Sequence, residues 1–111
     1  MSDDLTAEQP APPLSVREAQ RQVDATILAL GGYWPPLANL ARLFEECGEL
    51  ARSVNQAYGP KPVKVGENQT AIQDELGDVL YVALALANGL GVDAEEALRL
   101  AIETARARSE K

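Results

Sequence analysis

The chain has 111 residues, enough for one domain, with 17 acidic and 10 basic side chains and a formal net charge of −7. It contains no histidine and one cysteine, which excludes a Ser-His-Asp triad, imidazole metal sites, an internal disulfide and a zinc cluster. The acidic balance also argues against a nucleic-acid groove, which needs a basic face. Any metal site must use oxygen ligands, which favours Mg²⁺, Mn²⁺ or Ca²⁺.

The start of the chain is acidic and rich in proline, so we expect a disordered tail over 1–13 and a single helical domain over 14–111. It lacks the basic segment and the apolar segment that are typical of a signal peptide. The uncharged run from Val79 to Val92 is too short to cross a membrane. We therefore expect a soluble cytoplasmic protein that binds neither membranes nor nucleic acid.

Capping residues, prolines and glycines predict four helices, over 16–30, 37–58, 71–88 and 94–107. Ser15 with Glu18, and Thr70 with Gln73, form capping boxes before the first and the third of these helices. A loop over 59–69 precedes the third helix and is long enough to carry function. No alternation of apolar and polar residues predicts a strand. The expected fold class is therefore all-α, a four-helix bundle.

Each of the two central helices carries an apolar stripe that we expect to face the core. Spacings of three and four residues define both stripes. The stripe of the second helix comprises Leu40, Phe44, Cys47, Ala51, Val54 and Tyr58, and that of the third helix comprises Ile72, Leu76, Val79, Ala83, Leu86 and Leu90. Tyr81 lies opposite the stripe of the third helix, so we expect it to meet a partner subunit.

Two pairs of acidic residues, each three positions apart, occur on these same helices: Glu46 with Glu49, and Glu75 with Asp78. Residues at i and i+3 lie side by side on a helix, where like charges repel unless a cation bridges them. Glu75 also falls inside the apolar arc of its helix, where a carboxylate loses hydration. Antiparallel packing of the two helices would bring the four carboxylates together. The pattern therefore predicts a site for a divalent cation.

An interior glycine accompanies each acidic pair: Gly48 and Gly77 come one residue before the second carboxylate. Glycine inside a helix costs about 1 kcal/mol relative to alanine. We expect in return a close approach of the two helices, with no side chain obstructing the carboxylates.

The sequence around these residues resembles the signature of the MazG-like all-α nucleoside triphosphate pyrophosphohydrolases. The similarity covers about residues 30–98 and rests on Glu45-Glu46-x-x-Glu49, on Glu75-x-x-Asp78 and on the segments around them, among them Tyr58-Gly-Pro-Lys-Pro. The resemblance implies hydrolysis of a nucleoside triphosphate to the monophosphate and pyrophosphate, in housecleaning of the nucleotide pool. It also implies a homodimer or a homotetramer.

The same resemblance implies Mg²⁺, with Mn²⁺ as a substitute, held by Glu46, Glu49, Glu75 and Asp78. It makes Glu45 and Glu46 the candidates for the catalytic role, with Glu45 either activating the water or supporting a metal ligand from behind. Metal ions neutralise a triphosphate and lower the pKa of bound water. A carboxylate can accept the proton in a chain that has no histidine.

The candidates for substrate binding lie outside the acidic pairs. Lys61 and Lys64, on the proline-braced loop, suit the phosphates. Trp34 suits stacking on a base, although a hydrophobic staple is the commoner role, and Asn88 suits a polar contact to the base. We interpret Arg42 and Arg52 as ordinary surface charges.

Three alternatives stay open from the sequence. One is a dUTPase-like activity in the same superfamily. Another is a non-catalytic helical module that binds a nucleotide or a partner helix. The third is a plain dimerisation module, which would respond to neither Mg²⁺ nor nucleotide.

Overall fold

The computed structural model describes residues 10–60 and 65–110, with the backbone alone for 65–70. The described chain forms four helices and no strand: α2 (Val16–Ala29), α3 (Pro36–Tyr58), α4 (Val65–Leu90) and α5 (Ala94–Ser109). The prediction of an all-α chain with four helices is confirmed. Pro10–Pro13, within the expected tail, are exposed and form neither helix nor strand.

The first helix begins and ends where the sequence predicts. The Ser15 hydroxyl accepts a hydrogen bond from the backbone N–H of Glu18 at 3.0 Å, which satisfies one of the free N–H groups of the first turn. The chain leaves the helix through Gly31 and Gly32, whose φ angles of 119° and 106° are strained for residues with a Cβ. This turn directs the chain into α3, where Pro36 occupies the first helical position.

The helix α4 begins at Val65, about six residues before the predicted start, so the expected loop over 59–69 is shorter than predicted. Thr70 therefore lies inside the helix and does not cap it. A Thr-x-x-Gln pattern is compatible with a helix interior as well as with a helix start, and local capping signals are weak against the structural context.

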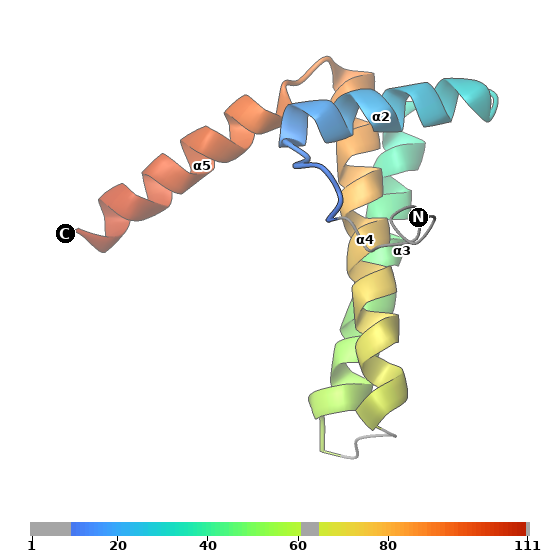
Figure 1. The fold of residues 1–111 in the computed structure, drawn as a ribbon, viewed down its shortest axis with the longest axis vertical. Helices are drawn as coiled ribbons and strands as arrows, with labels where there is room; N and C mark the ends of the chain where they lie inside the picture. The colour runs from blue at the N-terminus through green and yellow to red at the C-terminus, as the bar shows by residue number, and fades with distance from the viewer. Residues whose placement is uncertain (1–9, 61–64, 111) are drawn as a thin grey trace, which may run out of the picture.

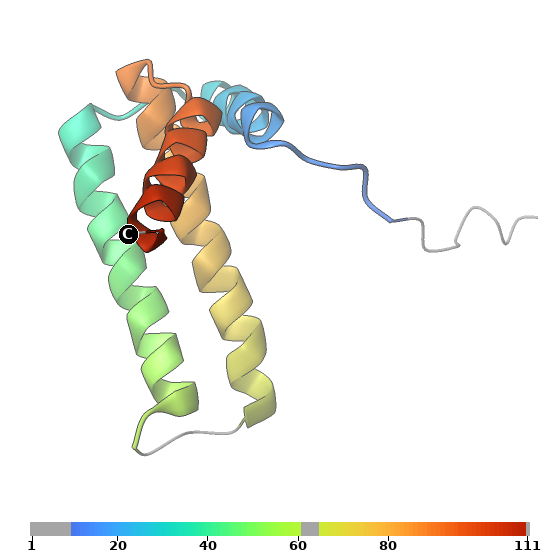
Figure 2. The ribbon, with the colours of Figure 1, turned by 90° about the vertical axis from the view of Figure 1, so that its left-hand side faces the viewer.

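The helices α3 and α4 lie side by side and antiparallel as a long hairpin, and α2 crosses its upper end (Figures 1 and 2). Side chains from α2 and α4 form the small core at this crossing. Val23, Ile27 and Ala85 are buried there, and partly buried Tyr33, Tyr81 and Leu84 pack against them. The core therefore occupies one end of the hairpin. Along the rest of the hairpin, α3 and α4 pack only against each other among the described residues.

A polar cluster fixes the turn between α4 and α5 against α2. Arg17 pairs with Asp93 at 2.8 Å, and Asp93 caps the first turn of α5. The Gln20 side chain donates to the carbonyl of Val92 at 2.6 Å and accepts from the N–H of Ala94 at 3.0 Å. These bonds hold α5 at an angle to the hairpin, so that it projects from the molecule as an arm (Figure 1).

The prediction that the stripe of α3 faces the core is wrong for this chain. Phe44 and Tyr58 are 67% and 72% exposed, and Cys47 is exposed as well. The buried residues of α3 are instead Asn39 and Ser53, on the side that faces α4. The periodicity correctly identifies an apolar face, but no described part of the chain covers this face.

The stripe predicted for α4 is also displaced. Val82 and Ala85 are the buried residues, whereas Leu76 and Leu90 are 45% and 56% exposed. Tyr81, expected to face outward, packs against the core instead. This helix is apolar on nearly all sides beyond Val79, so its periodicity does not distinguish the covered face.

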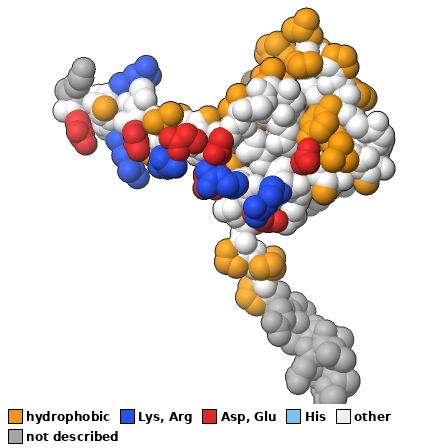
Figure 3. Space-filling model, turned by 90° about the horizontal axis from the view of Figure 1, so that it is seen from above, with side chains coloured by type: hydrophobic (Ala, Val, Ile, Leu, Met, Phe, Trp, Pro, Cys, Tyr) orange, Lys and Arg blue, Asp and Glu red, His pale blue; other side chains and the backbone are white. Residues whose placement is uncertain are grey.

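The molecule is open for its size. Its radius of gyration is 17.7 Å, against about 13 Å for a compact chain of this length. Figure 3 shows hydrophobic side chains at the surface of the main body and a mixture of acidic and basic side chains along α5, the arm at the left. In the described residues no single helix is long and apolar enough to cross a membrane; only the pair Ala71–Leu90 and Ala94–Ser109, bent by 110°, passes that test jointly.

Candidate active site

Three carboxylates from two helices converge midway along the hairpin. One oxygen from each of Glu46 on α3 and Glu75 and Asp78 on α4 lies within 4.8 Å of the other two. The antiparallel packing of α3 and α4 places residues that are far apart in sequence at the same level (Figure 2). Three of the four acidic residues that the sequence paired are therefore brought together.

The fourth, Glu49, lies one turn from Glu46 on α3 and is exposed. It is not among the three converging carboxylates, but its charge acts on Glu75. Burial raises the pKa of Glu75 above its ordinary value, and the negative charges of Glu49, Asp78 and Glu46 raise it further. A cluster of carboxylates that repel one another, with oxygen donors from two helices, fits a hard divalent cation.

The raised pKa of Glu75 predicts a pH-dependent stability. In the folded chain this carboxyl holds its proton at a higher pH than the unfolded carboxyl, whose pKa is about 4.3. The folded state then binds more protons within that window, so the contribution of Glu75 to stability decreases as pH rises. The wild-type melting temperature should therefore fall relative to that of Glu75→Gln as the pH rises above about 4.3 in EDTA, as measured by thermal denaturation. A difference that stays constant as the pH rises would contradict the raised pKa of Glu75.

The catalytic candidate Glu45 lies on the outer side of α3. With Glu46, Glu49 and Arg52 it lines a shallow surface hollow. Arg42 lies one turn before Glu46, and its Nε is 3.7 Å from the Glu46 carboxylate. Two arginines thus flank the acidic cluster along α3, although the sequence alone indicated only ordinary surface charges for them.

The expectation that α3 and α4 approach each other closely at the two glycines is wrong. A Cβ built on Gly48 or Gly77 meets no atom within 4 Å, and both residues are exposed. Gly48 lines the hollow beside Glu45, so the space next to the carboxylates is open to an incoming molecule.

Because the space around Gly77 is open, replacing this glycine by alanine should stabilise the fold. Gly77→Ala should raise the free energy of unfolding by up to about 1 kcal/mol, through higher helix propensity. Urea denaturation followed by circular dichroism measures this change, with Gly48→Ala as the matching variant on α3. A clear loss of stability would contradict the prediction and indicate a neighbour outside the described chain.

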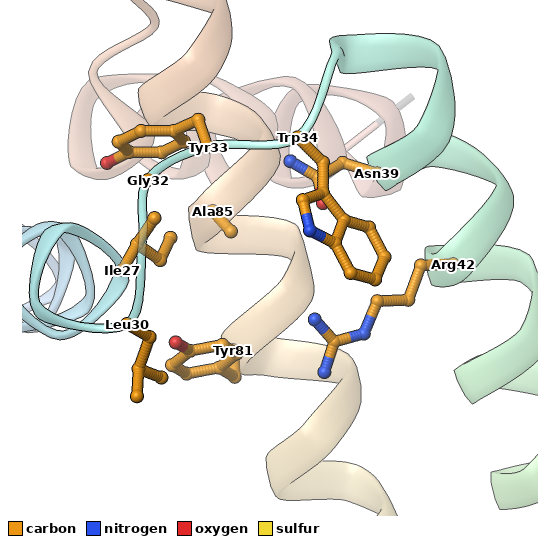
Figure 4. A pocket seen from close by; sticks show the side chains of 9 residues that line it. All are labelled: Ile27, Leu30, Gly32, Tyr33, Trp34, Asn39, Arg42, Tyr81 and Ala85. Carbon is orange, nitrogen blue, oxygen red and sulfur yellow. The ribbon is translucent and has the colours of Figure 1, made fainter.

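The four residues predicted to bind the substrate do not lie together in the described structure. Lys61 and Lys64 lie outside the described residues. Trp34 borders a cavity of about 190 Å³, and its ring faces the Arg42 guanidinium at 5.5 Å from ring centroid to Cζ (Figure 4). Asn88 lies elsewhere: its amide donates to the carbonyl of Gln20 at 3.0 Å, beside the polar cluster that holds α5.

Two further residues of this cavity were not predicted from the sequence. Asn39, on α3, is 5% exposed, and Tyr81 lines the cavity from the opposite helix, α4. The signal for Asn39 was its spacing: it precedes Glu46 by seven residues, two turns along the same face of α3. The face carrying Asn39, Arg42 and Glu46 therefore connects the cavity to the carboxylates.

Together these features define a class: an all-helical chain with a centre of converging carboxylates, flanked by arginines and open to solvent, which suits a cation-assisted reaction of phosphates. The sequence profile of the MazG nucleotide pyrophosphohydrolase domain matches residues 35–111. The chain belongs to this family. It is a nucleotide pyrophosphohydrolase, a hydrolase acting on acid anhydrides.

Individual relatives agree with this assignment. The YpjD protein of Bacillus subtilis strain 168 is 48% identical over 84 residues, which span 75% of this chain and 76% of that protein. A dATP/dGTP diphosphohydrolase of cyanophage S-2L is 38% identical over 97 residues, 87% of this chain and 79% of the phage protein.

Solved structures agree as well. The crystal structure of YpjD from B. subtilis has a TM-score of 0.76 at 42% identity, covering 85% of this chain and 97% of that chain. The crystal structure of a MazG nucleotide pyrophosphohydrolase conserved in Bacillus has a TM-score of 0.72 at 40% identity, covering 85% and 92%. Family membership decides against the non-catalytic modules that the sequence left open.

Proposed function

We propose that this chain hydrolyses deoxynucleoside triphosphates, with a preference for purines, to the monophosphate and pyrophosphate, in housecleaning of the cytoplasmic nucleotide pool. The convergence of Glu46, Glu75 and Asp78 within 4.8 Å is the observation that carries the proposal. The phage relative named as a dATP/dGTP diphosphohydrolase supports the choice of substrate.

The site has the donors that Mg²⁺ prefers. Glu46, Glu75 and Asp78 would hold the ion, with Glu49 one turn away as a fourth carboxylate, and Mn²⁺ would replace Mg²⁺. When bound, the ion supplies charge neutralisation of the triphosphate and a lower pKa of bound water. The raised pKa of Glu75 supports this assignment, because burial and the neighbouring negative charges both raise it, and a cation would relieve the repulsion among those charges.

The side chains of this chain would then perform the following roles. A water oxygen forms a bond to the α-phosphorus while the bond from that phosphorus to the bridging oxygen breaks, so that pyrophosphate leaves. Glu45 accepts the proton of the attacking water, and Arg42 and Arg52 balance charge on the phosphates. Lys61 and Lys64 keep their predicted role as phosphate-binding residues.

A nucleotide panel tests the proposal. The protein is incubated with each deoxynucleoside and ribonucleoside triphosphate, dUTP included, in Mg²⁺, and pyrophosphate and monophosphate are quantified by ion-exchange chromatography. We expect equimolar pyrophosphate and monophosphate, fastest from dATP or dGTP. Preference for dUTP would instead support the dUTPase-like alternative, and no release above that of Asp78→Asn with any nucleotide would refute the proposal.

We also propose that the chain acts as a homodimer, alone or within a tetramer, and that a second copy covers the outer face of α3. Along this face, Phe44, Val54 and Tyr58 are 67%, 40% and 72% exposed. Cys47, Ala51, Val54 and Tyr58 also line one shallow hollow there. A contiguous apolar face of this kind is typical of a subunit interface.

A further inference from the structure

The cavity bordered by Trp34 is built differently from the acidic centre. Its volume is about 190 Å³, and it lies between α2, the segment before α3, and the two helices of the hairpin (Figure 4). Trp34 lines its α3 side, whereas Tyr81 and Ala85 line its α4 side, and Ile27 adds an apolar wall from α2. Aromatic rings and aliphatic groups around a space of this size suit a flat ring rather than a phosphate.

One polar side chain in this lining stands out by its burial. Asn39 is 5% exposed and lines the cavity. Its carboxamide carries a donor and an acceptor side by side, which a flat polar ring in the cavity can match.

The cavity and the carboxylates are joined through Arg42. Its guanidinium faces the ring of Trp34 at 5.5 Å, and its Nε lies 3.7 Å from Glu46. Asn39 and Glu46 are seven residues apart on the same face of α3, a rise of about 10 Å. A ligand with a flat polar ring at one end and phosphates at the other would contact both places, with Arg42 between them.

We infer that the cavity binds the nucleobase and that Asn39 is the residue that determines base specificity, by pairing with a purine edge that offers a donor beside an acceptor, as N6 and N7 of adenine do. This inference rests on the proposed function, which assigns the phosphates to the carboxylates. The rings of Trp34 and Tyr81 hold the base, and the Asn39 carboxamide distinguishes its edge.

The test uses the intrinsic fluorescence of Trp34, the only tryptophan of the chain. Titration with dAMP, dGMP, dCMP and dTMP without metal reports binding in the cavity and requires no hydrolysis. We expect dAMP to quench the fluorescence at the lowest concentration. Asn39→Leu should reduce the preference for dAMP over dTMP by about 10-fold or more, the size of one good bidentate contact to a base.

Two further variants complete the test, one at Asn39 and one at a control position. Asn39→Asp keeps the shape of the side chain but loses the donor, so it should also lose the preference for dAMP, and circular dichroism confirms helix content for each variant. Gln22→Leu removes an exposed amide from α2 and should behave as the wild type.

The inference is overturned if the wild type binds the four nucleotides equally, if none quenches Trp34, or if folded Asn39→Leu and Asn39→Asp both keep the wild-type preference. None of these results decides whether the chain hydrolyses nucleotides, because the pyrophosphate assay tests the proposed function independently of the fluorescence. A folded Asn39 variant that still releases pyrophosphate, with altered base preference, supports both.

Discussion

Glu46→Gln should reduce the release of pyrophosphate by at least about 10²- to 10³-fold, the loss that follows removal of one group stabilising the transition state. Glutamine keeps the length of the side chain but removes the charge that, with Glu75 and Asp78, forms the only cluster of three acidic oxygens found in the described chain. Steady-state kinetics with dATP and Mg²⁺ measures the effect. The fold should persist, because the substitution relieves repulsion among the carboxylates.

A matched control for this variant is Glu103→Gln, which removes an exposed carboxylate from α5, a helix that projects away from the cluster. Its activity should equal that of the wild type. If Glu46→Gln kept more than a tenth of the wild-type kcat/KM while remaining folded, the carboxylate cluster could not be the catalytic centre.

Phe44→Glu should dissociate the protein into monomers. Phe44 is 67% exposed in the single chain and lies on the apolar face of α3. Burial of a side chain of this size contributes about 1.5–3 kcal/mol, and a dimer with twofold symmetry buries it twice. The dissociation constant should therefore rise by about 10²- to 10⁴-fold, as measured by analytical ultracentrifugation over a concentration series.

The control for the interface variant is Gln22→Glu, which adds the same charge to an exposed position of α2. It should leave the association state unchanged. A wild-type protein that sediments as a monomer at high concentration would contradict the dimer, and so would a Phe44→Glu protein that keeps the wild-type mass.

The helices were predictable because their end signals are local. Ser15, the glycine pair at 31 and 32, and Pro36 act through backbone groups within a few residues, so their meaning does not depend on the rest of the fold. The same locality explains the error at α4. Thr70 carries the signature of a helix start, but the helix begins at Val65, and nothing within a short window distinguishes the two cases.

The acidic centre was predictable because helical spacing places Glu75 beside Asp78, and the hairpin brings Glu46 to the same level. The covered faces of the helices were not predictable. Periodicity identifies the apolar side of α3 but not the element that packs on it, so Phe44 was assigned to a core that the described chain does not provide. Asn39 was missed because a lone amide at the start of a helix has many roles, and only the packing of α2 and α4 makes it buried.

Binding of Mn²⁺ tests the central claim most directly, because that claim is that α3 and α4 build one cation site together. Electron paramagnetic resonance of free Mn²⁺, titrated with the protein, gives the affinity without any need for turnover. We expect the wild type to bind Mn²⁺, and both Glu46→Gln on α3 and Asp78→Asn on α4 to weaken that binding by at least about 10-fold, since each removes one oxygen ligand. Wild-type affinity in either folded variant would contradict a site shared by the two helices.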